Sequence, residues 1–423
     1  MSRAGVGLAL AGLLATAALA VHASGAAAQA TTSHVVLYHD AVQPLAKTAE
    51  LERAHGFRAE HRYVAAVKGF AARLSPTQRA RVAADPDVAS LHEDREVRLI
   101  APVSLRRTKS GPSGVRRIGG GTKAAAVAVA VLDTGIDLHH PALNVESGAT
   151  CIAGQRRTTP AQDDNGHGTH VAGTIGAKDA AGVVGVAPGT KLYAVKVLNA
   201  SGSGTTAQAI CGIDWVTANA AKLHLKVASL SFGTPGTSDG DCGRANGDPL
   251  HRAICRSVEA GVTYVVAAGN DGADLGAFVP AAYPEVLTVT AMSDSDGAPG
   301  GRGAAPTCKA DERDDAFARF SNYASDAAEA AHVIAAPGVC ITSTWPGGRY
   351  ATISGTSMST QHVSGAVALC IGSGACSGAP AQVIATVRAD AARHATARNG
   401  FAGDPNDPVP RRWFGYLVWA GGY

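Results

Sequence analysis

The sequence predicts an α/β protein in which a mostly parallel sheet carries helices on both faces and follows a small α+β unit. Beyond residue 120, unbroken runs of small apolar residues alternate with helical stretches, a pattern typical of parallel strands buried on both faces. Before residue 101 the extended and helical stretches are short and mixed. The composition, with 46 % apolar and 17 % charged residues among 423, is that of a folded protein of two or three domains.

Residues 1–30 have the composition of a secretory signal peptide. Arg3 gives a positive start, residues 6–21 are nearly all apolar or small, and Ala28-Gln29-Ala30 fits a small-x-small cleavage site. The alternative is a membrane anchor, but the apolar stretch is shorter than the roughly 20 residues that span a bilayer. We therefore expect a secreted, extracellular protein that loses residues 1–30 and keeps no membrane anchor.

Residues 31–101 predict a compact β-α-β-β-α-β unit. Its expected elements are a strand over 35–38, a helix over 46–55, strands over 62–67 and 69–74, a helix over 76–84 and a strand over 88–91. Residues 95–121 are rich in Arg, Ser and Gly and predict an exposed linker, so a domain boundary is expected near residues 95–115. We divide the chain there into residues 31–101 and 102–423.

The second part carries the alternating pattern. Strands are expected over 124–132, 192–198, 227–232, 262–268, 286–291 and 333–336, and helices over 169–176, 205–224, 249–260 and 357–370. Ligands of such sheets bind at the carboxyl ends of the strands. The residues that follow each apolar run are therefore the first place to look for chemistry.

Charge and cysteine content exclude two classes of function. The formal charge is only +3 and the basic residues form no long stripe, which argues against nucleic-acid binding. All eight cysteines lie beyond residue 150 and none forms a C-x-x-C pair, so disulfides are favoured over zinc. Eight cysteines allow 105 connectivities, but Cys370 with Cys376 and Cys242 with Cys255 are close enough in sequence for local bridges.

Four polar residues stand at strand ends and helix starts. Asp133 and Asn270 follow apolar runs, whereas His167 and Ser357 precede helical stretches. Taken singly, each has a structural explanation as a turn former, loop residue or helix cap. Together they supply what nucleophilic acyl transfer needs: a hydroxyl, a base, an acid that orients the base, and a donor for the developing oxyanion.

The motifs around these residues resemble those of subtilases, the subtilisin-type serine endopeptidases, and most of all their proteinase K-like branch. They read Asp133-Thr134-Gly135, Asn165-Gly166-His167-Gly168-Thr169-His170, Ala267-Ala268-Gly269-Asn270 and Gly355-Thr356-Ser357-Met358-Ser359. Their order along the chain is that of the family. The similarity covers residues 115–372, and the unit before it resembles the family's inhibitor-type propeptide, best over residues 69–75.

The resemblance implies a role for each of these residues. Asp133 would orient His167, His167 would act as general base and then acid, and Ser357 would be the nucleophile. The Asn270 side chain and the Ser357 N–H would form the oxyanion hole. Other histidines (His170, His139 and His140) do not occupy the motif position of the base.

The resemblance also implies where substrate and calcium would bind. Substrate backbone would lie as an extra strand between two segments, with a pocket for the residue before the cut. The first segment is Gly202, Ser203 and Gly204, and the second is Ser231, Phe232 and Gly233. Ala267 and Gly269 would line the pocket. Ala142 stands where subtilisin has a carboxylate ligand of one calcium site. Pro280, Ala282 and Asp294 match a calcium site of the proteinase K-like branch. The alternative is that Asp294 is an acidic residue in a solvated loop.

Two positions depart from the family pattern. Ser229 stands where the family usually has Asn, and Gln361 stands where it usually has Pro, four residues after the nucleophile. Glutamine restores a backbone N–H that proline would lack. Neither change removes a reacting group, so we expect the same reaction with a helix that is straighter and a nucleophile that is slightly moved.

We therefore expect a monomeric secreted endopeptidase that is made as a zymogen and cuts polypeptide substrates without a cofactor for its chemistry. Its propeptide would act as an intramolecular inhibitor and be removed by a cut near Ala101, with bonds up to Gly114 left open. A catalytically silent relative would be free to lose one of the four polar residues. An α/β-hydrolase esterase would need Gly-x-Ser-x-Gly and the order Ser, acid, His, which this chain lacks.

Overall fold

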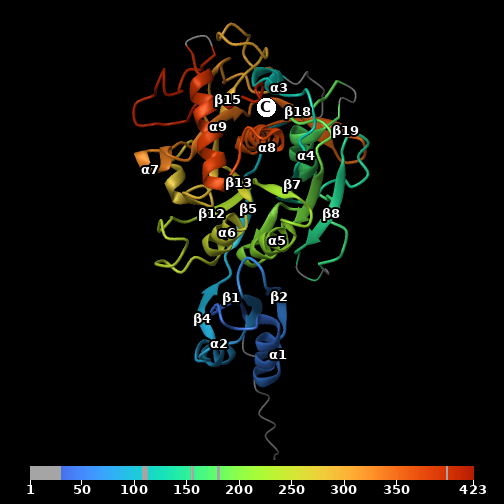
Figure 1. Cartoon of the computed structure of the whole chain (residues 1–423), viewed down its shortest axis with the longest axis vertical. Coiled ribbons are helices and arrows are strands. Elements are labelled where there is room, and N and C mark those ends of the chain that lie inside the picture. The colour runs from blue at the N-terminus through green and yellow to red at the C-terminus, as the bar shows by residue number, and fades with distance from the viewer. Residues whose placement is uncertain (1–29, 107–112, 153, 155–156, 179–181, 397–398) are drawn as a thin grey trace, which may run out of the picture.

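The computed structural model describes residues 30–106, 113–152, 154, 157–178, 182–396 and 399–423. The predicted signal peptide lies outside the described residues, except for Ala30. Figure 1 shows a large α/β body with a smaller unit below it. Among the described residues, no helix combines the length and apolarity that crossing a membrane needs.

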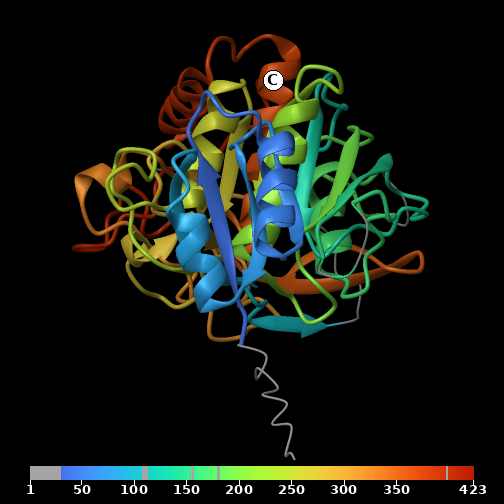
Figure 2. The same ribbon diagram turned by 90° about the horizontal axis from the view of Figure 1, so that it is seen from below.

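The N-terminal unit is the predicted β-α-β-β-α-β arrangement. Its elements are β1 (Thr32–Tyr38), α1 (Pro44–His55), β2 (Ala59–Tyr63), β3 (Gly69–Leu74), α2 (Pro76–Ala83) and β4 (Val88–Glu93). The antiparallel sheet has the order β2-β3-β1-β4. Both helices lie on its outer face, nearest the viewer in Figure 2, where Val36 and Phe70 pack under them. Val35 and Leu37 point the other way and join a core of the main body.

The main sheet has eight strands and is mostly parallel, as predicted. Its strands are β7 (Ala128–Asp133), β8 (Val145–Thr150), β9 (Leu192–Lys196), β11 (Leu225–Leu230), β13 (Thr263–Ala267), β15 (Leu287–Ser293), β16 (Ala316–Phe317) and β17 (Val333–Pro337). Their order is β16-β15-β13-β11-β7-β9-β8, with β17 also paired to β15 and β16 alone antiparallel. Successive residues of β7 serve two cores: Val129 and Val131 face one, and Ala130 and Leu132 the other.

Helices cover both faces, which explains why every residue of β7 is buried. One core includes residues of α4 (His167–Gly176), α8 (Thr356–Ser373) and α9 (Pro380–His394), and the other includes residues of α5 (Thr206–Asn219) and α6 (Pro249–Glu259). In Figure 1, α5 and α6 lie below the sheet, between it and the N-terminal unit. The fold class predicted from the apolar runs is confirmed.

Shorter elements surround the sheet. They are β10 (Ser203–Thr205), β12 (Phe232–Pro235), β14 (Phe278–Val279), the 3-10 turn η1 (Leu275–Ala277), α7 (Ala327–Ala330), and the hairpin β18 (Ile341–Trp345) and β19 (Arg349–Ser354). The eight cysteines form four disulfides: Cys151–Cys211, Cys242–Cys255, Cys308–Cys340 and Cys370–Cys376. The expected oxidation of all eight is confirmed, as are both expected local bridges.

The prediction of an exposed linker over residues 95–121 is wrong for its described part. That part contains β5 (Glu96–Leu99), β6 (Ser104–Arg106) and the short helix α3 (Ser113–Arg117). β5 lies between β10 and β12, and β6 pairs with β19. Val97 is fully buried and Ile100 is 5 % exposed, because strands from distant parts of the chain close over them.

Candidate active site

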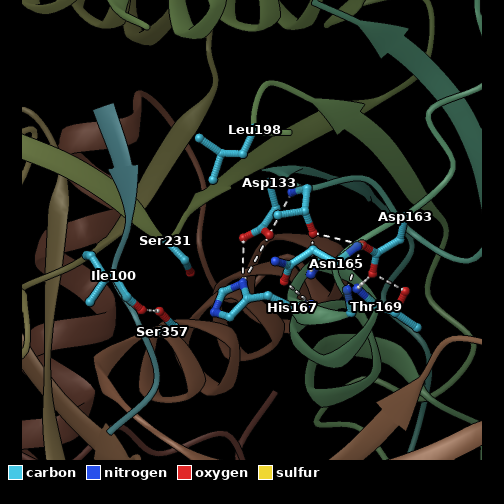
Figure 3. A network of polar contacts seen from close by, with 12 residues as sticks. Ile100, Asp133, Asp163, Asn165, His167, Thr169, Leu198, Ser231 and Ser357 are labelled. Atoms are coloured by element: carbon cyan, nitrogen blue, oxygen red, sulfur yellow. Dashed lines mark hydrogen bonds and ion pairs between the residues drawn. The ribbon is translucent and has the colours of Figure 1, made fainter. Parts of the chain in front are cut away.

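The parallel strands and two helices bring the four candidate residues to one edge of the main sheet. Asp133 is the last residue of β7, and Asn270 follows the end of β13. His167 is the first residue of α4, and Ser357 lies in the first turn of α8. Figure 3 shows the His167 ring between the Asp133 carboxylate and the Ser357 hydroxyl.

Asp133 fixes the orientation and tautomer of His167. Both side chains are buried, and Nδ1 of His167 lies 3.0 Å from each carboxylate oxygen of Asp133. An ionised carboxylate can only accept hydrogen bonds, so Nδ1 carries the proton and donates it. The opposite nitrogen, Nε2, then has a free lone pair; it is buried and has no hydrogen-bond partner in the described part of the chain.

A residue that the sequence reasoning missed, Asp163, holds the segment that leads into α4. Its Oδ1 accepts hydrogen bonds from the Thr134 hydroxyl and the Gly166 N–H, each at 2.9 Å. Its Oδ2 accepts from the N–H and the hydroxyl of Thr169. The buried carboxylate therefore ties the start of α4, which carries His167, to the residue after Asp133 (Figure 3). An acid just before an Asn-Gly turn and a helix start could have signalled this role.

Asn270 is held beside Ser357 by the residue that precedes the nucleophile. Its Oδ1 accepts from both the N–H and the hydroxyl of Thr356 at 2.9 Å. A Cβ on Gly355 would lie 3.0 Å from Asn270 Nδ2, so the motif glycine leaves room for this amide. Asn322, a second residue that the sequence reasoning missed, fixes the loop around Asn270. Its side chain accepts from the Asp271 N–H at 3.0 Å and donates to the Ala268 carbonyl.

The chain itself fills the predicted substrate position. In β5, Leu99 N–H donates to the Gly202 carbonyl at 2.8 Å, and Arg98 lies opposite Ser203 and Gly233 in the two flanking strands. Ile100 N–H donates to the Ser231 carbonyl at 3.0 Å. All six flanking residues named from the sequence, including Gly204 and Phe232, therefore lie beside a bound polypeptide strand.

Two polar contacts mark where this strand meets the candidate catalytic residues. The Ser357 hydroxyl donates to the Ile100 carbonyl at 3.2 Å, and Asn270 Nδ2 donates to the Ala101 carbonyl at 2.8 Å. An adjoining cavity of about 690 Å³ is lined by Gly269 and Asn270 among others. Ala267, the second expected pocket residue, is buried in β13 and does not line this cavity.

The N-terminal unit is anchored to the body by a buried carboxylate. Oδ1 of Asp214, in α5, accepts from three successive backbone N–H groups of the unit, those of Val64, Ala65 and Ala66, at 2.9, 2.7 and 3.0 Å. Because these groups bond to Asp214, residues 64–66 form a turn instead of continuing β2 as predicted. Tyr63 adds a hydrogen bond from its hydroxyl to the Ala207 carbonyl at 2.9 Å.

His170, the second histidine of the motif around His167, makes structural hydrogen bonds. His170 is fully buried, and its Nε2 lies 3.1 Å from the carbonyls of both Ile341 and Ala351, so this nitrogen donates. Burial lowers the pKa of His170 to about 3, which keeps the ring neutral. The His140 ring contacts Ala142 N–H and the Arg349 carbonyl.

The structure does not bring the predicted calcium ligands together, so that prediction is wrong. Ala281, between Pro280 and Ala282, accepts a hydrogen bond from Thr288 near the start of β15, whereas Asp294 follows the end of that strand. At about 3.3 Å per residue, the two ends lie roughly 20 Å apart. Asp294 instead neighbours the carboxylates of Asp296 and Asp314.

The comparisons with known proteins agree with this geometry. Residues 124–416 match the subtilase family, and residues 20–100 match the peptidase inhibitor I9 family. An alkaline protease of Alkalihalobacillus alcalophilus is 39 % identical over 70 % of this chain and 67 % of its own length. Subtilisin Savinase of Lederbergia lenta is 40 % identical over 62 % of this chain and 84 % of its own. The crystal structure of a cold adapted subtilisin-like serine proteinase superposes with a TM-score of 0.54 at 28 % identity, covering 74 % of this chain and 99 % of the other.

Proposed function

Because this chain belongs to the subtilase family of serine endopeptidases, we propose that Ser357, His167 and Asp133 hydrolyse peptide bonds through an acyl-enzyme. We further propose that the chain is a secreted zymogen that cuts itself. The observation that carries both proposals is the 3.2 Å contact between the Ser357 hydroxyl and the Ile100 carbonyl, inside a strand bound as substrate would be.

The proposed reaction assigns one step to each of these groups. Nε2 of His167 takes the Ser357 proton as the oxygen attacks the carbonyl carbon, and Asp133 stabilises the imidazolium that forms. The Ser357 N–H at the start of α8 and the Asn270 amide, which donates to the neighbouring Ala101 carbonyl before the reaction, would stabilise the oxyanion that forms on Ile100. His167 then gives its proton to the leaving amine, and water releases the acyl group by the same steps in reverse.

We propose Ile100–Ala101 as the bond that is cut first. Ser357 contacts the carbonyl before this bond and Asn270 the carbonyl after it, and the backbone ladder to the flanking strands ends with Ile100 N–H. The mature chain would then begin at Ala101. The division after residue 101 that we expect from the sequence would instead make Pro102 the first residue. Holding the bond against Ser357 within one chain favours this cut over cleavage between molecules.

The bound strand also supports a substrate preference. Val97 is fully buried and Ile100 nearly so, whereas the Arg98 side chain is 73 % exposed. We propose that peptides with an aliphatic residue before the cut and a second one three residues earlier are preferred, while the position of Arg98 accepts many side chains. The I9 match supports the inhibitor role of residues 31–100, and the four disulfides support export.

The experiment compares the wild-type chain with Ser357→Ala, both produced without other proteases. Wild type should yield a mature chain that begins at Ala101, read by N-terminal sequencing, and should hydrolyse a Val-Arg-Leu-Ile peptide substrate. Ser357→Ala should accumulate as the uncut precursor and lack this hydrolysis. A Ser357→Ala protein with a mature N-terminus would refute self-processing, and one that still hydrolyses the peptide would refute the nucleophile.

A further inference from the structure

A buried glutamine connects the residue of the nucleophile to the strand that binds substrate. Gln361 lies one turn after Ser357 in α8 and is 1 % exposed. Its Nε2 donates to the Ser357 carbonyl at 3.1 Å and to the Ser231 hydroxyl at 3.0 Å. Its Oε1 accepts from the Ser229 hydroxyl at 2.6 Å. The two positions that depart from the family pattern, 229 and 361, are therefore direct hydrogen-bond partners.

The orientation of this amide is forced by its neighbours. A side-chain amide has two N–H donors and one oxygen, and all three are used. Reversing it would place Oε1 against the Ser357 carbonyl oxygen with no proton between them. The Ser229 hydroxyl also accepts from Ser364 at 3.0 Å, so the network continues along α8. In a buried site each unmade hydrogen bond would cost about 1–3 kcal/mol, which favours one fixed arrangement.

The two residues that Gln361 joins hold opposite ends of the same substrate residue. The Ser231 carbonyl accepts from Ile100 N–H at 3.0 Å, and the Ser357 hydroxyl contacts the Ile100 carbonyl at 3.2 Å. Ser231 and Ser357 lie 126 positions apart in the sequence. In the described residues, Gln361 is the side chain that hydrogen-bonds to both of them, to the hydroxyl of Ser231 and to the backbone carbonyl of Ser357.

We propose that Gln361 is a positioning residue that sets the distance between the nucleophile and the carbonyl it attacks. This inference rests on the proposed function, because it assigns Gln361 a part in that reaction. Among the described residues, Gln361 hydrogen-bonds to neither residues 96–101 nor His167, so it would act on the reaction through Ser231 and Ser357. A displacement of about 1 Å at a reacting centre lowers the rate by about 100-fold.

The test is Gln361→Met, which keeps the length of the side chain and removes the amide. We expect kcat to fall about 10- to 100-fold, because the nucleophile is no longer fixed to the Ser231 strand. KM should change little, since Gly202 and Gly233 still pair with substrate. The acidic limb of the pH–rate profile should stay in place, because Asp133 and His167 are untouched. Active-site titration counts only folded, competent enzyme, so a lower yield does not imitate a lower kcat.

Ser359→Ala is the matched control. It removes a buried hydroxyl from the same turn of α8 that has no hydrogen-bond partner among the described residues, so kcat should stay at the wild-type value. If Gln361→Met does not fold, Ser229→Ala removes one bond of the amide and should lower kcat about threefold to tenfold with KM unchanged.

Three outcomes would overturn the positioning role: wild-type kcat in Gln361→Met, a rise in KM alone, or a loss that Ser359→Ala shares. If Ser229→Ala is used instead, a wild-type kcat of that variant would also overturn the positioning role. All of these presuppose a wild-type enzyme that cleaves the peptide and a Ser357→Ala variant that does not. A failure of the proposed function would appear in that first pair, before Gln361 is altered.

Discussion

Replacing Asp214 by alanine should weaken the hold of the peptidase body on its N-terminal unit more than any exposed ion pair between them does. The Asp214 side chain is fully buried, and one of its oxygens accepts three successive N–H groups of the unit. Removing it leaves those three donors without their acceptor at the interface. By contrast, the ion pair of Arg256 with Asp40 joins side chains that are 47 % and 83 % exposed.

The magnitudes of the two effects separate them. Truncating one partner of a buried, hydrogen-bonded charge costs about 2–5 kcal/mol. At 1.4 kcal/mol per factor of ten, this predicts an inhibition constant roughly 30- to 4,000-fold higher for Asp214→Ala. An exposed ion pair contributes about 0.2–1 kcal/mol, so Arg256→Ala in the enzyme should raise the constant at most about fivefold.

The assay measures inhibition of the mature enzyme by separately made residues 31–100. One preparation of the unit is used against wild-type and Asp214→Ala enzymes, so its own stability cancels in the ratio. The two enzymes should have equal kcat/KM on a short peptide, because Asp214 does not contact residues 96–101 of the cleft. A change below fivefold for the Asp214→Ala enzyme, or an equal effect of Arg256→Ala, would refute the reasoning.

Three further predictions concern catalysis and stability. Asn270→Ala should lower kcat by about 10²–10³, the range known for subtilisin, with little change in KM; a change in KM alone would contradict the oxyanion role. Removing the Cys151–Cys211 bridge, which spans 60 positions, should cost about 4 kcal/mol in urea unfolding of the inactive precursor, and a loss below about 1 kcal/mol would contradict the chain-entropy account. Burial lowers the pKa of His170 to about 3 and that of His362 to about 4, so between pH 6.5 and 4 the unfolded chain binds protons that the folded chain does not. Stability should therefore fall as pH drops through that window, by about 1.4 kcal/mol per pH unit for each histidine, and a flat thermal-unfolding profile would contradict it.

The main sheet could be predicted because its strands are buried on both faces. A run such as Val129 to Leu132 has no polar residue, and only a strand between two layers of helices needs that. The candidate site could be predicted because its motifs are short and local. His167 and Gly168 sit beside each other in sequence, and the helix that begins there keeps them together.

Contacts between distant segments could not be predicted in the same way. The composition of residues 95–121 indicates exposure, yet the short alternation around Val97 is that of a strand whose partners lie more than 100 positions away. Ser229 and Gln361 are 132 positions apart, and nothing local indicates that they meet. The calcium prediction failed because resemblance aligned Asp294 with a ligand without accounting for the length of β15.

The proposed removal of the N-terminal unit would have a consequence for solubility. When β5 leaves, β10 and β12 each lose a neighbour, and their backbone N–H and C=O groups face water as open sheet edges. Such edges can pair with a strand of another chain. A protease binds its substrate in this way, but the same pairing is also a route to aggregation. β10 has three residues and β12 has four, so neither offers an edge long enough to template a stable second sheet. The attached unit covers these two short edges, and their shortness would limit such pairing once the unit is gone.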